Sequence, residues 1–122
     1  MIAVLDAQGE NVLMCLRRKP PYQGLWNLVG GKLEPGESGE EAAYRELFEE
    51  TAIPRGELAL WHVMDFVYHA SAIRMEVWAG RLARLAVPEG GKPFGLASLR
   101  SRPRTAQSKI VVTALFRREE GL

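Results

Sequence analysis

The sequence contains a single cysteine, Cys15, so the chain cannot form a disulfide within itself. A lone thiol is typical of a reducing compartment, because secreted domains of this size often depend on several disulfides. The sequence also lacks any apolar run long enough for a signal peptide or a membrane span. Together these absences predict a cytoplasmic protein that does not use a membrane.

The sequence also has no large excess of positive or negative charge. There are 16 basic and 15 acidic residues, which gives a net charge of +1 and makes no strong case for a nucleic-acid partner. The charge is unevenly placed, since residues 90–118 hold seven basic side chains and no acidic one. No repeat, low-complexity segment or second domain is visible. With 47% hydrophobic residues in 122, we expect one domain over residues 1–122, present as a monomer or homodimer.

Hydrophobic periodicity and turn residues divide the chain into strands and helices. Strands are expected over 1–6, 11–18, 25–29, 58–68 and 73–82, and helices over 38–51 and 105–118. This order of strands, helix, strands and helix predicts the α+β class.

The most informative segment is acidic. Seven carboxylates lie within residues 34–50, and Arg45 is the only basic residue among them. If this segment is helical, Glu46, Glu49 and Glu50 are spaced i, i+3 and i+4 and share one face. Carboxylates this close repel one another, so the pattern indicates a bound cation. Clustered oxygen ligands suit Mg²⁺ or Mn²⁺.

The ends of the expected helix also have recognisable signals. Ser38 and Glu41 form the Ser-x-x-Glu pattern of a capping box at the start. At the other end, Ala52 stands where a glycine would readily adopt the left-handed conformation of a helix C-cap. An alanine there is expected to cost stability and to leave the chemistry intact.

The acidic segment and the glycine before it resemble the Nudix box, Gly-x5-Glu-x7-Arg-Glu-U-x-Glu-Glu-x-Gly-U, where U is aliphatic. The matching positions are Gly31, Glu37, Arg45, Glu46, Leu47, Glu49, Glu50 and Ile53. The one departure is Ala52 in place of the last glycine. The resemblance implies an α/β/α sandwich with a mixed sheet between helices.

The resemblance also implies an activity: Nudix enzymes hydrolyse a nucleoside diphosphate linked to another group, through attack of water at phosphorus. Glu49 and Glu50 match the family's chief metal-ligating carboxylates, and the carbonyl of Gly31 often joins them. Glu46 matches a position that binds metal or orients the water. The general base varies within the family, so it stays open between Glu46 and a residue outside the motif.

Two further motif residues have implied supporting roles. Arg45 matches the arginine that holds the helix carboxylates in place by ion pairing, a task that suits a bidentate guanidinium. Glu37 matches a residue that supports the loop or contributes to the metal site.

Residues before and at the start of the motif point to the substrate. Arg18 ends the second expected strand, where the family often places an arginine against phosphate, although a solvated strand end explains it equally well. Lys32 could pair with phosphate or with a motif carboxylate. Trp26 and Asn27 begin a run that resembles the Trp-Asn-x-x-Gly-Gly-Lys run of oxidised-purine triphosphate hydrolases, in which the Asn helps to read the base. Otherwise Trp26 belongs to the core and Asn27 ends a strand.

These observations favour a Mg²⁺-dependent nucleotide pyrophosphohydrolase that converts a nucleoside triphosphate, including an oxidised purine, to monophosphate and pyrophosphate. One alternative is a dinucleoside polyphosphate hydrolase. Another is a non-catalytic Nudix domain that senses a nucleotide or RNA. The enzyme is favoured over the sensing domain because the sequence keeps every carboxylate of the motif.

Overall fold

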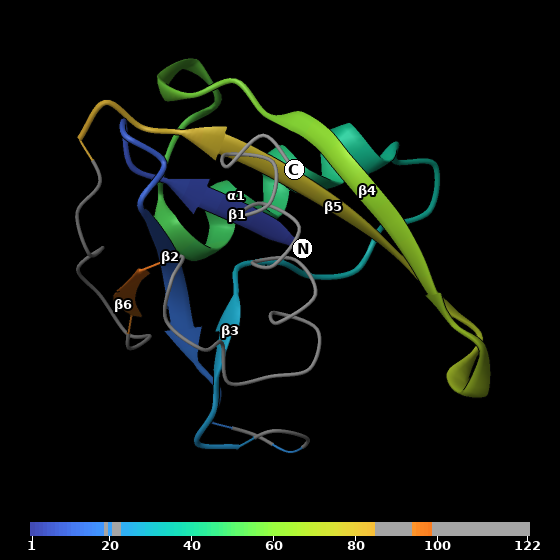
Figure 1. Cartoon of the computed structure of the whole chain (residues 1–122). Coiled ribbons are helices and arrows are strands. Elements are labelled where there is room, and N and C mark those ends of the chain that lie inside the picture. Colours follow the sequence, from blue (N-terminus) through green and yellow to red (C-terminus); the bar gives the residue numbers. More distant parts are fainter. Residues whose placement is uncertain (19, 21–22, 85–93, 99–122) are drawn as a thin grey trace.

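Six strands and one α-helix make up the described part of this computed structural model (Figure 1). The structure describes residues 1–18, 20, 23–84 and 94–98. In chain order the elements are β1 (Ile2–Leu5), β2 (Asn11–Leu16), β3 (Trp26–Leu28), α1 (Gly39–Thr51), the 3₁₀ helix η1 (Arg55–Glu57), β4 (Trp61–Tyr68), the 3₁₀ helix η2 (His69–Ser71), β5 (Ile73–Arg81) and β6 (Phe94–Ser98).

The strands form one mixed sheet in the order β3-β2-β1-β5-β4, and β6 pairs with β2 off this path. Strands β1 and β5 run parallel, with Ile2 opposite Trp78, while the other pairs are antiparallel. The β4–β5 ribbon extends beyond the rest of the sheet and ends at η2 (Figure 1). The predicted α+β class with a mixed sheet is confirmed.

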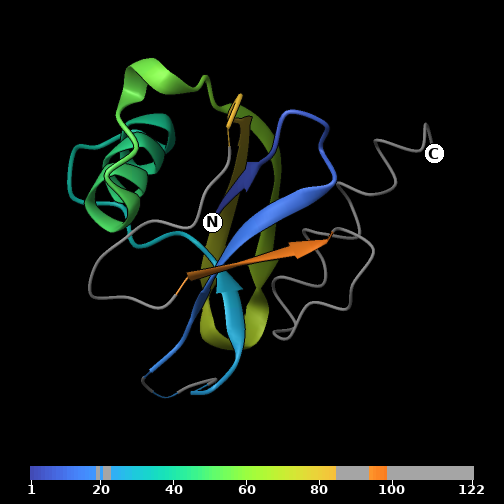
Figure 2. The same cartoon turned by 90° about the vertical axis from the view of Figure 1, so that its left-hand side faces the viewer.

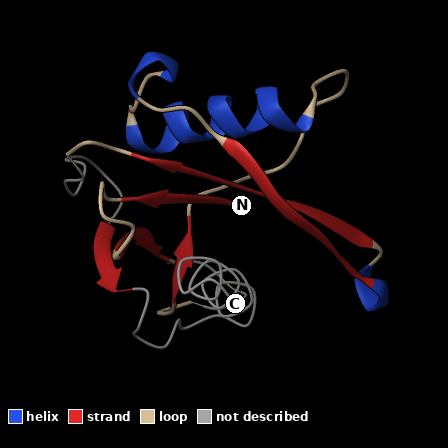
Figure 3. Cartoon of the chain, turned by 45° about the horizontal axis from the view of Figure 1, so that its top comes forward, coloured by secondary structure: helices blue, strands red, loops and turns tan. Residues whose placement is uncertain are grey.

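The sheet is apolar on both faces, and the alternation along β1 separates them. Ile2 and Val4 point into one buried cluster, whereas Ala3 and Leu5 point into the other. Helix α1 packs on the Ile2 face, where it adds Ala43 and Leu47 to the cluster (Figures 2 and 3). Full burial of a leucine side chain stabilises the fold by roughly 1.5–3 kcal/mol. The apolar side of α1 therefore holds the helix on the sheet and turns its other side outward.

Most predicted elements are present in the described part of the chain, and two differences stand out. The strand expected over 58–68 begins only at Trp61, because Leu58 is buried in the core and the Leu60 amide donates to Tyr44 Oη (2.8 Å) instead of joining the sheet. Strand β6 was not predicted at all. The helix expected over 105–118 lies outside the described residues.

None of the helices in the described part of the chain has both the length and the apolar character needed to cross a bilayer.

Candidate active site

Helix α1 carries the predicted carboxylates and begins as the sequence indicates. The hydroxyl of Ser38 accepts a hydrogen bond from the Glu41 amide (3.1 Å), which caps the first turn. The helix ends at Thr51, and Ala52 adopts the left-handed conformation with φ 61° and donates its amide to the Phe48 carbonyl (2.8 Å). The alanine at the motif's glycine position therefore completes the same kind of C-cap, at the conformational cost that L-residues have there.

The guanidinium of Arg45 joins the loop before α1 to the helix carboxylates. Nε and Nη2 donate to the two carboxylate oxygens of Glu37, at 2.6 and 2.8 Å. Nη1 donates to Glu46 Oε1 (2.9 Å) and to Glu49 Oε2 (3.2 Å). Nη2 also donates to the Lys32 carbonyl (3.0 Å). One cation thus fixes the loop and two of the three helix carboxylates in a single arrangement.

Glu37 is held on the loop side of this network. Besides both bonds from Arg45, its Oε1 accepts from the Glu34 amide (3.0 Å). The hydrogen bonds from the Arg45 side chain lower the pKa of Glu37 to about 2. Both oxygens of Glu37 are engaged, which fits support of the loop better than coordination of a metal.

The carboxylate of Glu46 lies directly against Gly31. A Cβ atom built on Gly31 would overlap all three atoms of that carboxyl group, so only glycine leaves room for this approach. One oxygen of Glu46 and one of Glu49 accept no hydrogen bond from any described residue, since Arg45 reaches only Oε1 of the first and Oε2 of the second. Carboxylate oxygens that accept no hydrogen bond, close to the backbone of a glycine, are the hard oxygen ligands that Mg²⁺ and Mn²⁺ prefer. The donor set therefore fits a divalent ion.

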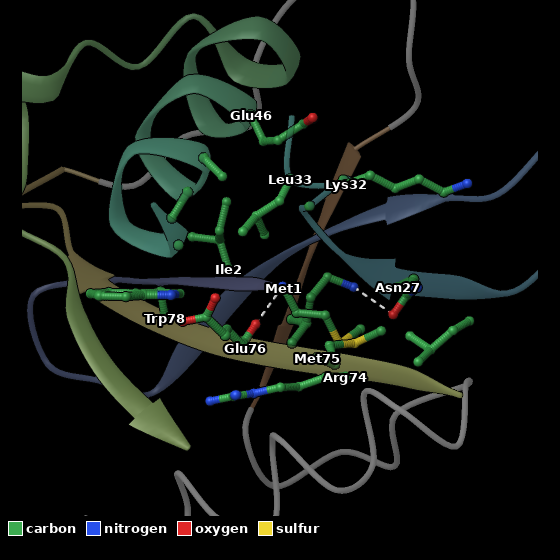
Figure 4. Close-up of a pocket in the computed structure, with 17 residues that line it drawn as sticks. Met1, Ile2, Asn27, Lys32, Leu33, Glu46, Arg74, Met75, Glu76 and Trp78 are labelled. Atoms are coloured by element: carbon green, nitrogen blue, oxygen red, sulfur yellow. Dashed lines mark hydrogen bonds between the residues drawn. The ribbon is translucent and has the colours of Figure 1, made fainter. Parts of the chain in front are cut away.

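A cavity of about 640 Å³ lies between α1, the Gly30–Gly31 turn and strand β5 (Figure 4). Its lining includes four of the predicted site residues: Asn27, Gly31, Lys32 and Glu46. Cavities of 300–1,000 Å³ are typical of small-molecule sites.

The other predicted site residues lie outside this lining. Arg18 is exposed, two residues past the end of β2. Glu49 is exposed and Glu50 is partly buried, both one turn along α1 from Glu46.

Asn27 is buried in β3, with only 9% of its surface exposed. Its Oδ1 accepts the amide of Leu28 at 2.9 Å. Both roles predicted for Asn27, a contact with the base and a structural role in the strand, are compatible with its position. The residue belongs to β3 and also lines the cavity. Trp26 packs against the buried cluster on the other face of the sheet.

Several cavity residues were not predicted from the sequence. They come mainly from β5 and from the loop after Gly31: Leu33, Ile73, Arg74, Met75, Glu76 and Trp78. Glu76 gave no motif signal, because only the parallel pairing of β5 with β1 brings it beside the cavity.

A second acidic group lies on the β4–β5 ribbon. Ligand atoms of His62, Asp65 and Glu76 all lie within 4.8 Å of one another. Asp65 is already paired with Arg74 Nη2 and with His62 Nε2, each at 2.7 Å. The hydrogen bond from Arg74, followed by that from His62, lowers the pKa of Asp65. Unlike the motif carboxylates, which keep oxygens free of hydrogen bonds, Asp65 at the centre of this group has its charge balanced by Arg74.

Comparisons with known proteins identify a family for this chain. The family model described as NUDIX domain matches residues 1–94. The CTP pyrophosphohydrolase of Escherichia coli (strain K12) is 35% identical over 81 residues, covering 52% of this chain and 60% of that protein. The oxidized purine nucleoside triphosphate hydrolase of Danio rerio is 42% identical over 50 residues, covering 41% of this chain and 32% of that protein. The matched part thus spans less than two thirds of either relative.

The fold has close counterparts among solved structures. The crystal structure of a C. elegans Ap4A hydrolase binary complex superposes with a TM-score of 0.74 at 18% identity, covering 98% of this chain and 94% of that one. At this level of identity the likeness concerns the fold, and it confirms the sandwich that the sequence resemblance implied.

Proposed function

The chain belongs to the NUDIX domain family, and from this premise we propose that it is a divalent-metal-dependent hydrolase that cleaves a pyrophosphate bond in a nucleotide. The observation that carries the proposal is a single cavity that combines two chemistries. Gly31 and Glu46 of the acidic motif line one part of it, and the buried amide of Asn27 lines another. The family and the names of the relatives support a hydrolase of this class. We propose one such domain over residues 1–122.

The proposed metal is Mg²⁺, with Mn²⁺ as a substitute. Glu46, Glu49 and Glu50 would hold it together with the carbonyl of Gly31. A bound ion of this kind neutralises phosphoryl oxygens and makes water a stronger nucleophile. The close contact of Glu46 with Gly31 supports this set, because it brings a carboxylate and an open backbone together at the cavity.

The protein's own residues then fix the geometry. Arg45 orients Glu46 and Glu49 through Nη1 and anchors the loop through Glu37, so we assign Arg45 and Glu37 positioning roles. Glu46 also faces the cavity, which makes it a candidate to orient or deprotonate the attacking water. A base outside the motif stays the other candidate.

The proposed substrate is a nucleoside triphosphate, including an oxidised purine, which yields a monophosphate and pyrophosphate. Asn27 would bind the base edge, since an amide both donates and accepts hydrogen bonds. Lys32 is exposed at the cavity and is suited to phosphate. Arg18 is assigned to phosphate on its exposure and its place after β2, and it requires a substrate that reaches beyond the cavity.

A nucleotide panel assayed with Mg²⁺ tests the proposal. Monophosphate and pyrophosphate released from a nucleoside triphosphate would support it. Preferential cleavage of a dinucleoside polyphosphate would favour the first alternative. Tight nucleotide or RNA binding without turnover would favour the sensing domain.

Substitution of the helix carboxylates separates catalysis from folding. Glu49→Gln and Glu50→Gln should each lower turnover at least about a hundredfold, because charge stabilisation by a metal contributes several kcal/mol. Glu57→Gln is the matched control, since Glu57 is exposed on η1 and away from the cavity. Near-normal turnover in both helix variants at limiting Mg²⁺ would reject the metal assignment. A melting temperature that does not rise when millimolar Mg²⁺ replaces EDTA would reject it independently.

A further inference from the structure

The cavity runs along α1 between two carboxylates. Gly39, Ala42, Ala43 and Glu46 line it from the helix, at the spacing of one helical face. Gly39 and Glu46 are seven residues apart, which corresponds to about 10 Å along the axis. The wall between them carries only methyl side chains. The cavity is therefore long enough to hold a group well beyond the proposed metal site at Glu46.

Glu76 of β5 supplies the carboxylate at the far end. A Cβ on Gly39 would overlap the Glu76 carboxyl group, so the two are in direct contact at the start of α1. Glu76 is partly buried, and the Met1 ammonium donates to its backbone carbonyl (2.9 Å) at the edge of the cavity. Among the described residues, none donates a hydrogen bond to the side-chain carboxylate of Glu76. Its oxygens are not among the fully buried unpartnered atoms of the described residues, so a group that enters the cavity can reach them. Because an ionised carboxylate only accepts hydrogen bonds, the ligand group that suits it is a hydrogen-bond donor.

The surroundings of Glu76 suit a flat, partly apolar ligand. Trp78 lies beside it on β5 and lines the same cavity (Figure 4). Leu33 and Ile73 also line it and are about half exposed, at 52% and 49%. Asn27 lies across the cavity from Glu76 (Figure 4). Aromatic and aliphatic surfaces with a few polar groups are the usual composition of such sites.

We propose that Glu76 determines base specificity by accepting hydrogen bonds from the donor edge of the substrate base. The inference rests on the proposed function, because it places the phosphates at Glu46 and the base at Glu76. Guanine bases present a ring N–H and an exocyclic amino group side by side, and two carboxylate oxygens can accept both. Hypoxanthine has the same ring N–H without the amino group. The site therefore prefers guanine nucleotides to hypoxanthine nucleotides.

A structural role for Glu76 is the competing explanation. Its contact with Gly39 places a negative charge at the positive end of α1, which would stabilise the helix without any ligand. A helix role predicts lower thermal stability on loss of the charge and no change in base preference. The two explanations therefore give different results in one set of variants.

The test compares kcat/KM for dGTP and dITP in the wild type, in Glu76→Gln and in Glu57→Gln. The wild type should prefer dGTP by about tenfold or more, as expected for a lost hydrogen bond to a charged group. Glu76→Gln should bring the ratio close to one, and the Glu57→Gln control should keep the wild-type ratio. A wild-type ratio near one, or an unchanged ratio in Glu76→Gln, overturns the inference. Glu76→Ala serves if Glu76→Gln does not fold.

Binding measurements separate this inference from the proposed function. Calorimetry with dGMP and dIMP in EDTA requires neither metal nor turnover. If no nucleotide is hydrolysed, the proposed function fails, and these affinities alone decide on Glu76. A preference for dGMP that disappears in Glu76→Gln would support the base contact. Equal affinities for both monophosphates would overturn it.

Discussion

The carboxylate of Glu46 occupies the space that a side chain on Gly31 would need. The contact joins the turn after β3 to the second turn of α1, two segments brought together by the fold. Gly31 has no positive φ angle, so its backbone conformation is open to other residues. The requirement for glycine here is therefore one of space and not of backbone conformation.

Gly31→Ala should lower kcat/KM by about a hundredfold, because displacement of a catalytic group by about 1 Å can cost that much. The added methyl group must push Glu46 away from the loop. Gly56→Ala is the matched control, since a Cβ there meets no atom within 4 Å. Steady-state kinetics over a Mg²⁺ titration would measure both. Normal activity and metal affinity in Gly31→Ala would remove Glu46 from the metal site.

The Arg45–Glu37 pair should make stability depend on pH. The folded-state pKa of Glu37 is about 2, below its ordinary value of 4.5. Its contribution is therefore complete above pH 4.5 and is lost as the pH falls toward 2. Urea unfolding of the wild type and Glu37→Gln should show a gap in stability that narrows between pH 5 and pH 2. A gap that stays constant over this range would contradict the depressed pKa.

The left-handed C-cap at Ala52 should be improvable. Ala52→Gly should raise the free energy of unfolding by about 0.5–1 kcal/mol, because glycine adopts positive φ without steric cost. Ala59→Gly is the control: Ala59 is exposed and has no positive φ, so glycine there should destabilise through the entropy of the unfolded chain. Thermal and urea unfolding would measure both, and turnover of Ala52→Gly should stay at the wild-type level. Destabilisation by Ala52→Gly would show that the cap is not strained.

The sequence predicted what depends on local spacing. The helix, its serine cap and the shared face of Glu46 and Glu49 follow from residues within a few turns of one another. The ion pairing of Arg45 with the helix carboxylates was implied by the resemblance to the Nudix box. The strands expected over 58–68 and 73–82 follow from their apolar runs, and they pair as the antiparallel strands β4 and β5. Local pattern was sufficient in these cases because the interacting groups are close in sequence.

The features that the sequence missed depend on distant pairing. Strand β6 is short and forms its ladder with β2, about eighty residues earlier in the chain. Glu76 reaches the cavity only because β5 pairs in parallel with β1 and packs beside the start of α1. An isolated glutamate in a strand has no local signal for such a role. Long-range topology has to be known before its position can be interpreted.

Asn27 offers the clearest separation of a structural from a substrate role. Its side chain accepts the Leu28 amide within a buried strand, and it also lines the cavity. If it binds a purine edge, Asn27→Ala should change the ratios of kcat/KM among dGTP, dATP and 8-oxo-dGTP by about ten- to a hundredfold, since a lost hydrogen bond in a desolvated site costs roughly 1–3 kcal/mol. The Mg²⁺ dependence should not change.

Asn11→Ala is the matched control for this prediction. Asn11 Nδ2 donates to Asp6 Oδ2 (2.7 Å) at the start of β2, and Asn11 does not line the cavity. Loss of that bond should lower stability and leave the substrate ratios as in the wild type. If Asn27→Ala behaves in the same way, with lower stability and unchanged ratios, Asn27 supports β3 alone. Base recognition would then have to come from the β5 side of the cavity.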